Sequence, residues 1–323
     1  MALYLGTQKV ASTNISEGGT GKLVIDREVS AQGDYGMPTQ NFTFKLPSNA
    51  TDLGDYALNS AFYGCTALTS VDVSSLTTVS GNSSLESAFY GCTALTSLID
   101  LSNLTTISGQ YGMGYTFDRC IGITSVDLSS LTTIGSYALD GAFYGCSALT
   151  SADLSSLITV GDHAMDETFR SCINLPSVNL SSLMTINTRA MYCTFLGCRA
   201  LVSADLSNLT TANGQEAMSD TFSGCINLTS VDLSSLSSIN GSHVLQRTFQ
   251  QCTSLTSLSF PSLSSNSFGS YTNQFNNMLL GVTDCTVHFP SNLQSVVGSW
   301  SDVVAGFGGT NTTILYDLPA TNN

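Results

Sequence analysis

The chain has 323 residues and a mass of 33.9 kDa, which is enough for two ordinary globular domains or one elongated repeat array. Apolar residues make up 42 % of the chain and charged residues only 10 %, with 9 basic against 23 acidic residues and a net charge of −14. A chain this acidic is repelled by phosphate backbones and anionic bilayers, which argues against nucleic acid and membrane surfaces as partners.

The first 40 residues differ from the rest of the chain. They open with MALYLGTQKV, which lacks a basic segment followed by an apolar core, so no secretory signal peptide is predicted. No run of eighteen apolar residues occurs anywhere, and no membrane span is expected. Two short strand-like runs, residues 3–5 and 23–25, enclose a glycine-rich connector at residues 16–21. We interpret residues 1–40 as an N-terminal cap or attachment segment, and its opening resembles the start of phage tail-associated proteins.

A Phe-x-x-Cys tetrad recurs through the middle of the chain, with successive cysteines 26 to 28 residues apart. The eight pairs are Phe62/Cys65, Phe89/Cys92, Phe117/Cys120, Phe143/Cys146, Phe169/Cys172, Phe195/Cys198, Phe222/Cys225 and Phe249/Cys252. After each cysteine comes a phrase of the form L-x-x-V-x-V-x-x-L, as in residues 68–76. Recurrence in register at this period indicates a repeat array.

Each repeat has the pattern of a strand, a turn and a short helix. Val71 and Val73 alternate with polar residues, which predicts a short strand that points its valines inward. In residues 137–146 the apolar residues fall at helical spacing on one face, which predicts a short helix. Glycines such as Gly64 and Gly145 stand where that helix would turn left-handed and end.

No single repeat can bury its apolar face alone, but stacked repeats share a continuous core. We therefore predict an α/β fold, a right-handed solenoid with a parallel β-sheet on its concave face and short helices on its convex face. About eight repeats occupy residues 41–262, beginning with a degenerate one at residues 42–65. Residues 263–323 are predicted to form a C-terminal cap, in which a strand ends at Pro290 and Trp300 and residues 314–316 close the core.

The order F-x-x-C-x-x-L-x-x-V/I-x-L, preceded by A-(M/L)-x-x-(A/T)-F, resembles the BspA-type leucine-rich repeats. The resemblance covers about two thirds of the chain. It implies binding at a cell surface or to a host matrix, without enzyme activity, and it carries over no ligand residues. The aspartate at the outward strand position and the missing export signal are departures from the family pattern.

One candidate site is a column of outward-facing residues on the strands. Its members are Asp72, Asp100, Asp127, Asp153, Asn179, Asp205 and Asp232. Parallel stacking sets neighbouring carboxylates about 5 Å apart, where like charges repel by just under ~1 kcal/mol in water. Such a ladder should attract cations or donor-rich ligands, and a weakly bound surface cation such as Ca²⁺ is the one cofactor it suggests. The alternative is a solvated polar face that keeps the sheet soluble.

A second candidate site is formed by two columns that vary between repeats, six residues before and one residue after each phenylalanine. Their tyrosines are Tyr56, Tyr63, Tyr90, Tyr111, Tyr137 and Tyr144. Rigid amphipathic rings make good interface anchors, so these residues are predicted to bind a ligand. The alternative is packing along the flank of each helix.

Catalytic and metal-binding motifs are not found. The recurring cysteines are predicted to stack as buried free thiols, while the redox state of Cys193 and Cys285 stays open. His163, His243 and His288 have no partners at motif spacing. Residues 16–23 resemble a phosphate-binding loop but lack its first glycine and its Ser or Thr.

The preferred interpretation is a non-enzymatic adhesion or recognition protein, outside the cell or on its surface. Its partner would be a protein or glycan on a host or neighbouring cell surface. An alternative is a phage tail-associated receptor-binding protein of a virion, docked to other virion proteins through residues 1–40. A further alternative is a structural or ice-binding solenoid, suggested by Thr pairs such as Thr77-Thr78, but these pairs lapse at Ile158, Met184 and Ser237.

Overall fold

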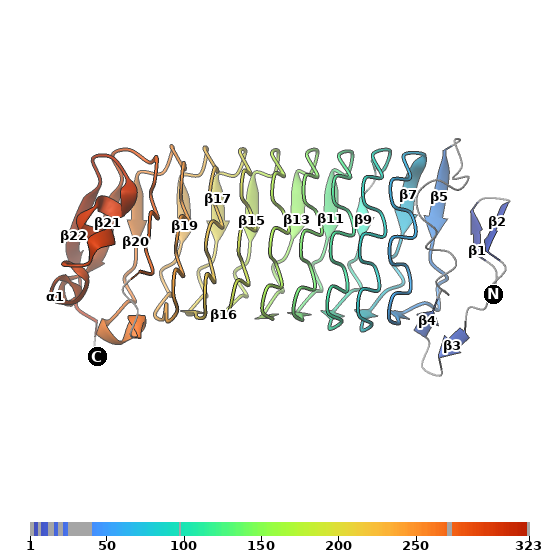
Figure 1. Ribbon diagram of the computed structural model, residues 1–323, viewed down its shortest axis with the longest axis horizontal. Coiled ribbons are helices and arrows are strands. Elements are labelled where there is room, and N and C mark those ends of the chain that lie inside the picture. Colours follow the sequence, from blue (N-terminus) through green and yellow to red (C-terminus); the bar gives the residue numbers. More distant parts are fainter. Residues whose placement is uncertain are drawn as a thin grey trace.

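The computed structural model is a solenoid of stacked coils, in accordance with the predicted repeat architecture (Figure 1). It describes residues 41–96, 98–269 and 273–321, together with the backbone of four short strands near the N-terminus. These are β1 (Leu3–Leu5), β2 (Gln8–Ala11), β3 (Ser16–Gly18) and β4 (Lys22–Val24). The expected connector therefore contains a strand, since β3 pairs antiparallel with β4. The proposed attachment role of residues 1–40 and the similarity to a phosphate-binding loop lie largely outside the described residues.

The longer strands of the coils lie side by side and form one face of the rod, which we call the strand face (Figure 1). They are β5 (Phe42–Lys45), β7 (Leu68–Asp72), β9 (Ile99–Asp100), β11 (Ser125–Asp127), β13 (Ser151–Asp153), β15 (Ser177–Asn179), β17 (Ser203–Asp205), β19 (Ser230–Asp232) and β20 (Ser257–Ser259). Neighbouring strands pair in parallel, for example Val126 with Ala152. The predicted parallel solenoid is thus confirmed.

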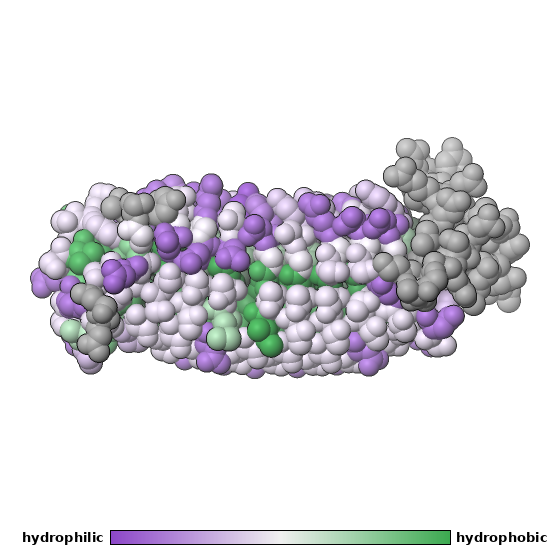
Figure 2. Space-filling model, turned by 90° about the horizontal axis from the view of Figure 1, so that it is seen from below, coloured by the Kyte–Doolittle hydropathy of each residue, from purple (hydrophilic) through white to green (hydrophobic). Residues whose placement is uncertain are grey.

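A second row of very short strands forms another face, which we call the threonine face. After β6 (Asp52–Leu53), it contains β8 (Thr78–Val79), β10 (Thr106–Ile107), β12 (Thr133–Ile134), β14 (Thr159–Val160), β16 (Thr185–Ile186) and β18 (Thr211–Ala212). The last six of these form one parallel sheet in register. Figures 1 and 2 both show the coils stacked along a nearly straight axis, so the expected concave and convex faces are close to flat.

The third side of each coil, which we call the turn wall, differs from the prediction. It comprises residues 56–64, 83–91, 111–119, 137–145, 163–171, 189–197, 216–224 and 243–251. The predicted short helices are wrong, because these segments consist of consecutive turns. The backbone enters the left-handed region every fourth residue, with φ of +57° at Tyr137, +56° at Gly141 and +67° at Gly145. The expectation of left-handed glycines at positions such as Gly64 and Gly145 is confirmed.

Hydrogen bonds in the turn wall alternate between two directions. The N–H groups of Leu139, Gly141 and Phe143 donate to carbonyl groups of the next coil, at N···O distances of 2.8 to 2.9 Å. The N–H groups between them donate three residues back within the same coil, as from Ala142 to Leu139. The backbone polar groups of one coil are therefore satisfied largely by the next coil, as in a sheet.

The apolar spacing of the repeat fits this turn pattern as well as a helix. Residues 138, 139, 142, 143 and 146 face inward, and all five are fully buried. A repeat of four residues advances by about 90° per residue and a helical repeat of 3.6 residues by about 100°. The two diverge by about 80° over eight residues, which is less than the roughly 100° width of the apolar stripe of an amphipathic helix. A segment of nine residues is too short for apolar spacing to separate the two conformations.

The core contains two stacked columns. The phenylalanines from Phe62 to Phe249 stack with ring centroids 5.3 to 5.8 Å apart and interplanar angles of at most 13°. Seven cysteine thiols, from Cys92 to Cys252, each donate to the carbonyl oxygen of the phenylalanine in the preceding coil, at 3.0 to 3.2 Å. The prediction of buried, stacked free thiols is confirmed, and Cys193 and Cys285 are also free and buried.

The strand face is interrupted between β7 and β9, between β13 and β15, and between β19 and β20. The interruption between β13 and β15 has a clear cause in the sequence. β9, β11 and β13 form one sheet and β15, β17 and β19 another. Pro176 precedes β15 at the position where Thr150 and Val202 donate their N–H groups to the preceding coil. Because proline has no N–H, it cannot donate to the carbonyl of Thr150, and the ladder stops there.

The solenoid continues into the C-terminal segment. β21 (Thr286–Pro290) and β22 (Thr313–Leu318) pair in parallel with β20 and with each other. Short helical turns follow β21, namely α1 (Gln294–Val297) and α2 (Ser301–Val304). Trp300 packs edge-on against Phe268 with centroids 5.0 Å apart. Of the residues predicted to close the core, Trp300, Ile314 and Tyr316 pack against it, whereas Leu315 is exposed.

A pair of glycines tests the tight stacking of the coils. A Cβ at Gly109 would lie 1.9 Å from the carbonyl oxygen of Gly81, whereas a Cβ at Gly64 would meet nothing within 4 Å. We expect Gly109→Ala to lower the free energy of unfolding by more than about 2 kcal/mol, because backbone must move. Gly64→Ala should cost about 1 kcal/mol, because only its positive φ is strained. Urea denaturation of both variants measures this, and the reverse order would contradict the stacking described.

Candidate recognition surface

The carboxylate ladder on the strand face stabilises the turn that follows each strand. The side-chain oxygen of every ladder residue accepts the N–H of the serine two residues later, for example Ser129 to Asp127 at 3.0 Å. The same bond occurs at Asp72, Asp100, Asp153, Asn179, Asp205 and Asp232. This local bond is an Asx-turn, which gives the column a structural role independent of any ligand.

The ladder is not continuous along the rod. Asp100, Asp127 and Asp153 pair in register in one sheet, and Asn179, Asp205 and Asp232 in the other. Asp72 pairs instead with Lys45, whose ammonium lowers the pKa of the Asp72 carboxyl. Within the described residues, no group of three or more His, Cys, Asp or Glu side chains is arranged to hold a metal ion. Binding of a cation such as Ca²⁺ at the ladder stays a prediction.

The predicted tyrosines of the turn wall come together in two stacks. Tyr63 and Tyr90 lie parallel with ring centroids 4.5 Å apart. Tyr137 lies between Tyr111 at 4.7 Å and His163 at 4.5 Å. Tyr144 is covered by Arg170, and Tyr56 is 47 % exposed at the N-terminal end of the wall. The side chains pack on each other across coils and keep one edge toward solvent.

Three arginines on the turn wall share one arrangement, in which the guanidinium group lies near a tyrosine ring and a carboxylate. Arg119 is 5.8 Å from the centroid of Tyr90 and 3.8 Å from Asp118. Arg170 is 5.4 Å from Tyr144 and 2.6 Å from Glu167. Arg189 is 3.9 Å from Tyr192 and 3.5 Å from Asp166. Ring and carboxylate together form a site suited to a planar cation.

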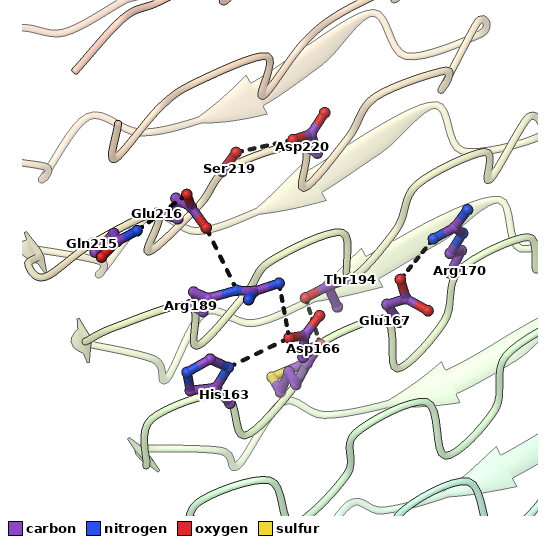
Figure 3. Close-up of polar contacts among 11 residues, drawn as sticks. His163, Asp166, Glu167, Arg170, Arg189, Thr194, Gln215, Glu216, Ser219 and Asp220 are labelled. Atoms are coloured by element: carbon purple, nitrogen blue, oxygen red, sulfur yellow. Dashed lines mark hydrogen bonds and ion pairs between the residues drawn. The ribbon is translucent and has the colours of Figure 1, made fainter. Parts of the chain in front are cut away.

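These groups form a chain of ion pairs that crosses several coils (Figure 3). His163 lies 3.5 Å from Asp166, which pairs with Arg189, and Arg189 reaches Glu216 at 3.6 Å. Further along the wall, Arg247 binds Asp220 through two nitrogens at 3.0 Å. The wall is therefore a patterned charged surface.

Four aspartates of the wall are largely removed from water. Asp118, Asp140, Asp166 and Asp220 are 6 %, 8 %, 9 % and 7 % exposed. Burial raises the pKa of Asp118 to about 6 and that of Asp140 and Asp166 to about 7. Nearby Glu167 adds to the shift at all three positions. These carboxyls change charge near neutral pH, unlike ordinary surface aspartates.

The other reactive side chains have structural surroundings. His243 contacts the Asn273 amide at 3.2 Å and His288 lies 3.0 Å from Asp317. Burial raises the pKa of the Cys120 and Cys252 thiols to about 12, and that of Cys193 likewise. Thiols held in this protonated state are poor nucleophiles.

Sequence reasoning found the tyrosine columns but missed Tyr115, Asp140, Asp166 and Glu167. These residues lie two or three positions before the phenylalanine, in columns that also change from coil to coil. Variation between otherwise uniform repeats was the signal that could have identified them.

Comparison with known proteins identifies a related sequence family. The model of the BspA type leucine rich repeat region matches in six copies at residues 38–141, 59–194 and 168–298. A search of curated proteins gave no match.

Solved leucine-rich repeat structures resemble the chain at low identity. A leucine rich repeat protein of T. pallidum is 24 % identical, with a TM-score of 0.39, over 58 % of this chain and 78 % of that one. A leucine-rich repeat protein of Bacteroides ovatus is 19 % identical, with a TM-score of 0.34, over 84 % and 83 %. The pneumococcal vaccine antigen PcpA is 18 % identical, with a TM-score of 0.42, over 87 % and 68 %.

The buried aspartates predict an unusual dependence of stability on pH. The folded chain binds more protons than the unfolded chain at Asp118, Asp140 and Asp166 between about pH 4 and 7, because their pKa values are raised from 3.8. Stability from these groups is therefore greatest at low pH and declines as pH rises through the folded pKa values. Burial lowers the pKa of His163 and opposes this trend, but as one group against three.

We expect the urea midpoint to fall between pH 5 and pH 8. In the Asp140→Asn/Asp166→Asn variant this slope should be flatter, because two of the three titrating groups are gone. A midpoint that rises over the same range in the parent chain would contradict the burial of these carboxyls.

Proposed function

Because the chain belongs to the BspA-type leucine-rich repeat family, we propose that it is a non-enzymatic recognition module that binds a surface protein or glycan through its turn wall. Membership rests on the family model, which spans most of the chain, from residue 38 to residue 298. The proposal places the protein outside the cell or on its surface, with display on a virion as the alternative. Within the described residues, no helix has the length and hydropathy needed to cross a bilayer.

One observation carries the assignment to the turn wall. On the strand face, six of the seven strands from β7 to β19 present the same pattern of serine and Asp or Asn, and β9 differs only in having Leu98 at the serine position. On the turn wall, outward positions change from Tyr to His, Arg, Glu or Gln between coils. Within residues 54–252 every arginine except Arg199 lies on this wall. A uniform scaffold with one variable, aromatic and charged side supports specific recognition on that side.

The assignment is tested by comparing two faces of the same chain. The full chain is screened on a glycan array and against surface proteins of candidate host cells, and each ligand found is then titrated. We expect Tyr111→Ala/Tyr137→Ala to weaken binding at least about tenfold, because two anchoring rings are removed. Asp127→Ala/Asp153→Ala should bind like the parent chain. The opposite result would move the site to the strand face.

The threonine face supports a second candidate function. The segment 74–80 and its counterparts in the next six coils contain no charged side chain. The first threonine of each pair is replaced in some coils, as by Ile158 and Met184, which are 48 % and 52 % exposed. The second threonine is present in six successive coils. Thr78, Thr106, Thr133, Thr159, Thr185 and Thr211 pair in register. Figure 2 views this side, which is mostly of intermediate hydropathy.

The hydroxyl groups of the two threonine columns are used differently. Thr77, Thr105 and Thr132 donate to carbonyl oxygens of the preceding coil. In the second column, the hydroxyls of residues 78, 106, 133, 159 and 185 make no hydrogen bond to any described residue. Their spacing is about 4.8 Å, close to the roughly 4.5 Å between second-neighbour oxygens in tetrahedral ice with O···O distances of about 2.75 Å. We propose ice binding as the second candidate.

Ice binding has a direct test. The parent chain should show thermal hysteresis, and Thr133→Tyr/Thr159→Tyr should abolish it, because two bulky rings break the regular plane. Thr124→Tyr, on the margin of the strand face, is the matched control and should retain it. Absence of hysteresis in the parent chain, or equal loss in the control, would reject this function.

A further inference from the structure

Asp140 is the exception among the carboxylates of the turn wall. Asp118, Asp166, Glu167, Glu216 and Asp220 each lie within 4 Å of an arginine nitrogen. Glu86 is half-buried and accepts a hydrogen bond from the Asn59 amide. Asp140 forms no ion pair with any described residue, although it is only 8 % exposed.

Three tyrosines surround this carboxylate. Tyr137, three residues earlier in the same turn, stacks with Tyr111 of the preceding coil at 4.7 Å. The Tyr115 N–H donates to the Asp140 carbonyl at 2.7 Å, and the Tyr115 ring lies over Gly141, where a Cβ would stand 2.4 Å from Cε1. Gly114 is the counterpart of Asp140 in the preceding coil, and a Cβ there would stand 3.2 Å from Cδ1 of Tyr111, so that ring lies beside the column that contains Asp140.

The neighbouring coils show which group lies beside a tyrosine ring and a carboxylate on this wall. In three places the wall places a guanidinium group near a tyrosine ring and beside a carboxylate, and each time the arginine comes from the chain itself. Around Asp140 the ring and the carboxylate are present, but no described cation forms an ion pair with it, and Arg189 only lowers the pKa of Asp140 from beyond ion-pair distance. A hollow lined by Tyr137, His163 and Asp162, among other polar residues, borders the ring stack.

We propose that Asp140, with the rings of Tyr111 and Tyr137, binds an arginine or lysine side chain presented by a partner protein. The inference rests on the proposed recognition role of the turn wall and narrows its partner to a protein with a basic segment. Charge favours this partner, since the chain carries −14 and the Asp140 carboxylate forms no ion pair with any described residue. The flanking rings favour arginine over lysine, because guanidinium is planar and weakly hydrated.

The proposal is tested with a defined probe. A fluorescein-labelled peptide of alternating arginine and glycine is titrated against the full chain, beside the same peptide with citrulline in place of arginine. We expect the arginine peptide to bind and the citrulline peptide, which keeps the shape but lacks the charge, to bind at least about tenfold more weakly.

Two variants with the same net charge then locate the site. Asp140→Asn keeps the shape of the side chain and should weaken binding of the arginine peptide about tenfold, because a partly buried charge pair and its ring contacts are lost. Asp153→Asn on the strand face removes one charge elsewhere and should bind within about twofold of the parent chain. Equal weakening by both variants, no effect of Asp140→Asn, or no preference for arginine over citrulline would overturn the proposal.

This outcome is separable from failure of the proposed function. If a ligand from the surface screen depends on Tyr111 and Tyr137 but not on Asp140, the turn wall remains the recognition surface and the cation site is wrong. Thermal melting of both Asn variants checks that each is folded. A melt within a few degrees of the parent chain assigns any loss of peptide binding to the site itself.

Discussion

Hydrogen bonding from one coil to the next is the constraint on which the rest of the structure depends. On the turn wall every second N–H donates to the following coil, and on the strand face the ladder runs between the same neighbours. Inside, the phenylalanine rings and the cysteine thiols repeat this contact at each step. A coil without neighbours would expose both its apolar side and its backbone polar groups, so neither can be satisfied in isolation. The fixed register that results is what aligns outward side chains into columns and makes a surface from residues about 27 positions apart.

Much of this architecture could be predicted from the sequence, because the recurring Phe-x-x-Cys tetrad fixes the period and the alternation at Val71 and Val73 fixes the strand. The left-handed glycines could also be predicted, since only a residue without Cβ avoids strain there. The conformation of the turn wall could not. Its apolar residues stand four apart, and over nine residues that spacing is shared by a helix and by a run of tight turns. Non-glycine residues such as Tyr137 and Glu167 at positive φ give no local sequence signal, because the neighbouring coil imposes that backbone.

The candidate surface was predictable in part. The tyrosine columns could be located because their positions vary between otherwise uniform repeats. The cross-strand carboxylates could be located because they recur at the same position of each repeat. The structure shows that the carboxylates of the strand face accept hydrogen bonds from local turns, whereas the most buried acidic groups lie on the turn wall, at Asp118, Asp140, Asp166 and Asp220. Their surroundings arise from side chains of two or three different coils, as where Tyr115 reaches Asp140. Such contacts depend on which columns are adjacent in space, and the linear order of residues does not state this.

The positive φ angles of the turn wall have a consequence for how this protein can diversify. Three residues in each coil adopt this strained backbone, and at those positions the chain holds Tyr, Ser, His, Arg, Cys, Glu, Asp and Gln as well as Gly. The conformational cost, about 1 kcal/mol or more for a residue with a Cβ, is nearly independent of what lies beyond the Cβ. Exchanging one large polar side chain for another at these positions therefore changes the conformational energy of the backbone very little. The backbone of each coil is thus fixed while the outward side chains at these positions can differ, so the pattern of charged and aromatic groups on the turn wall can change one position at a time.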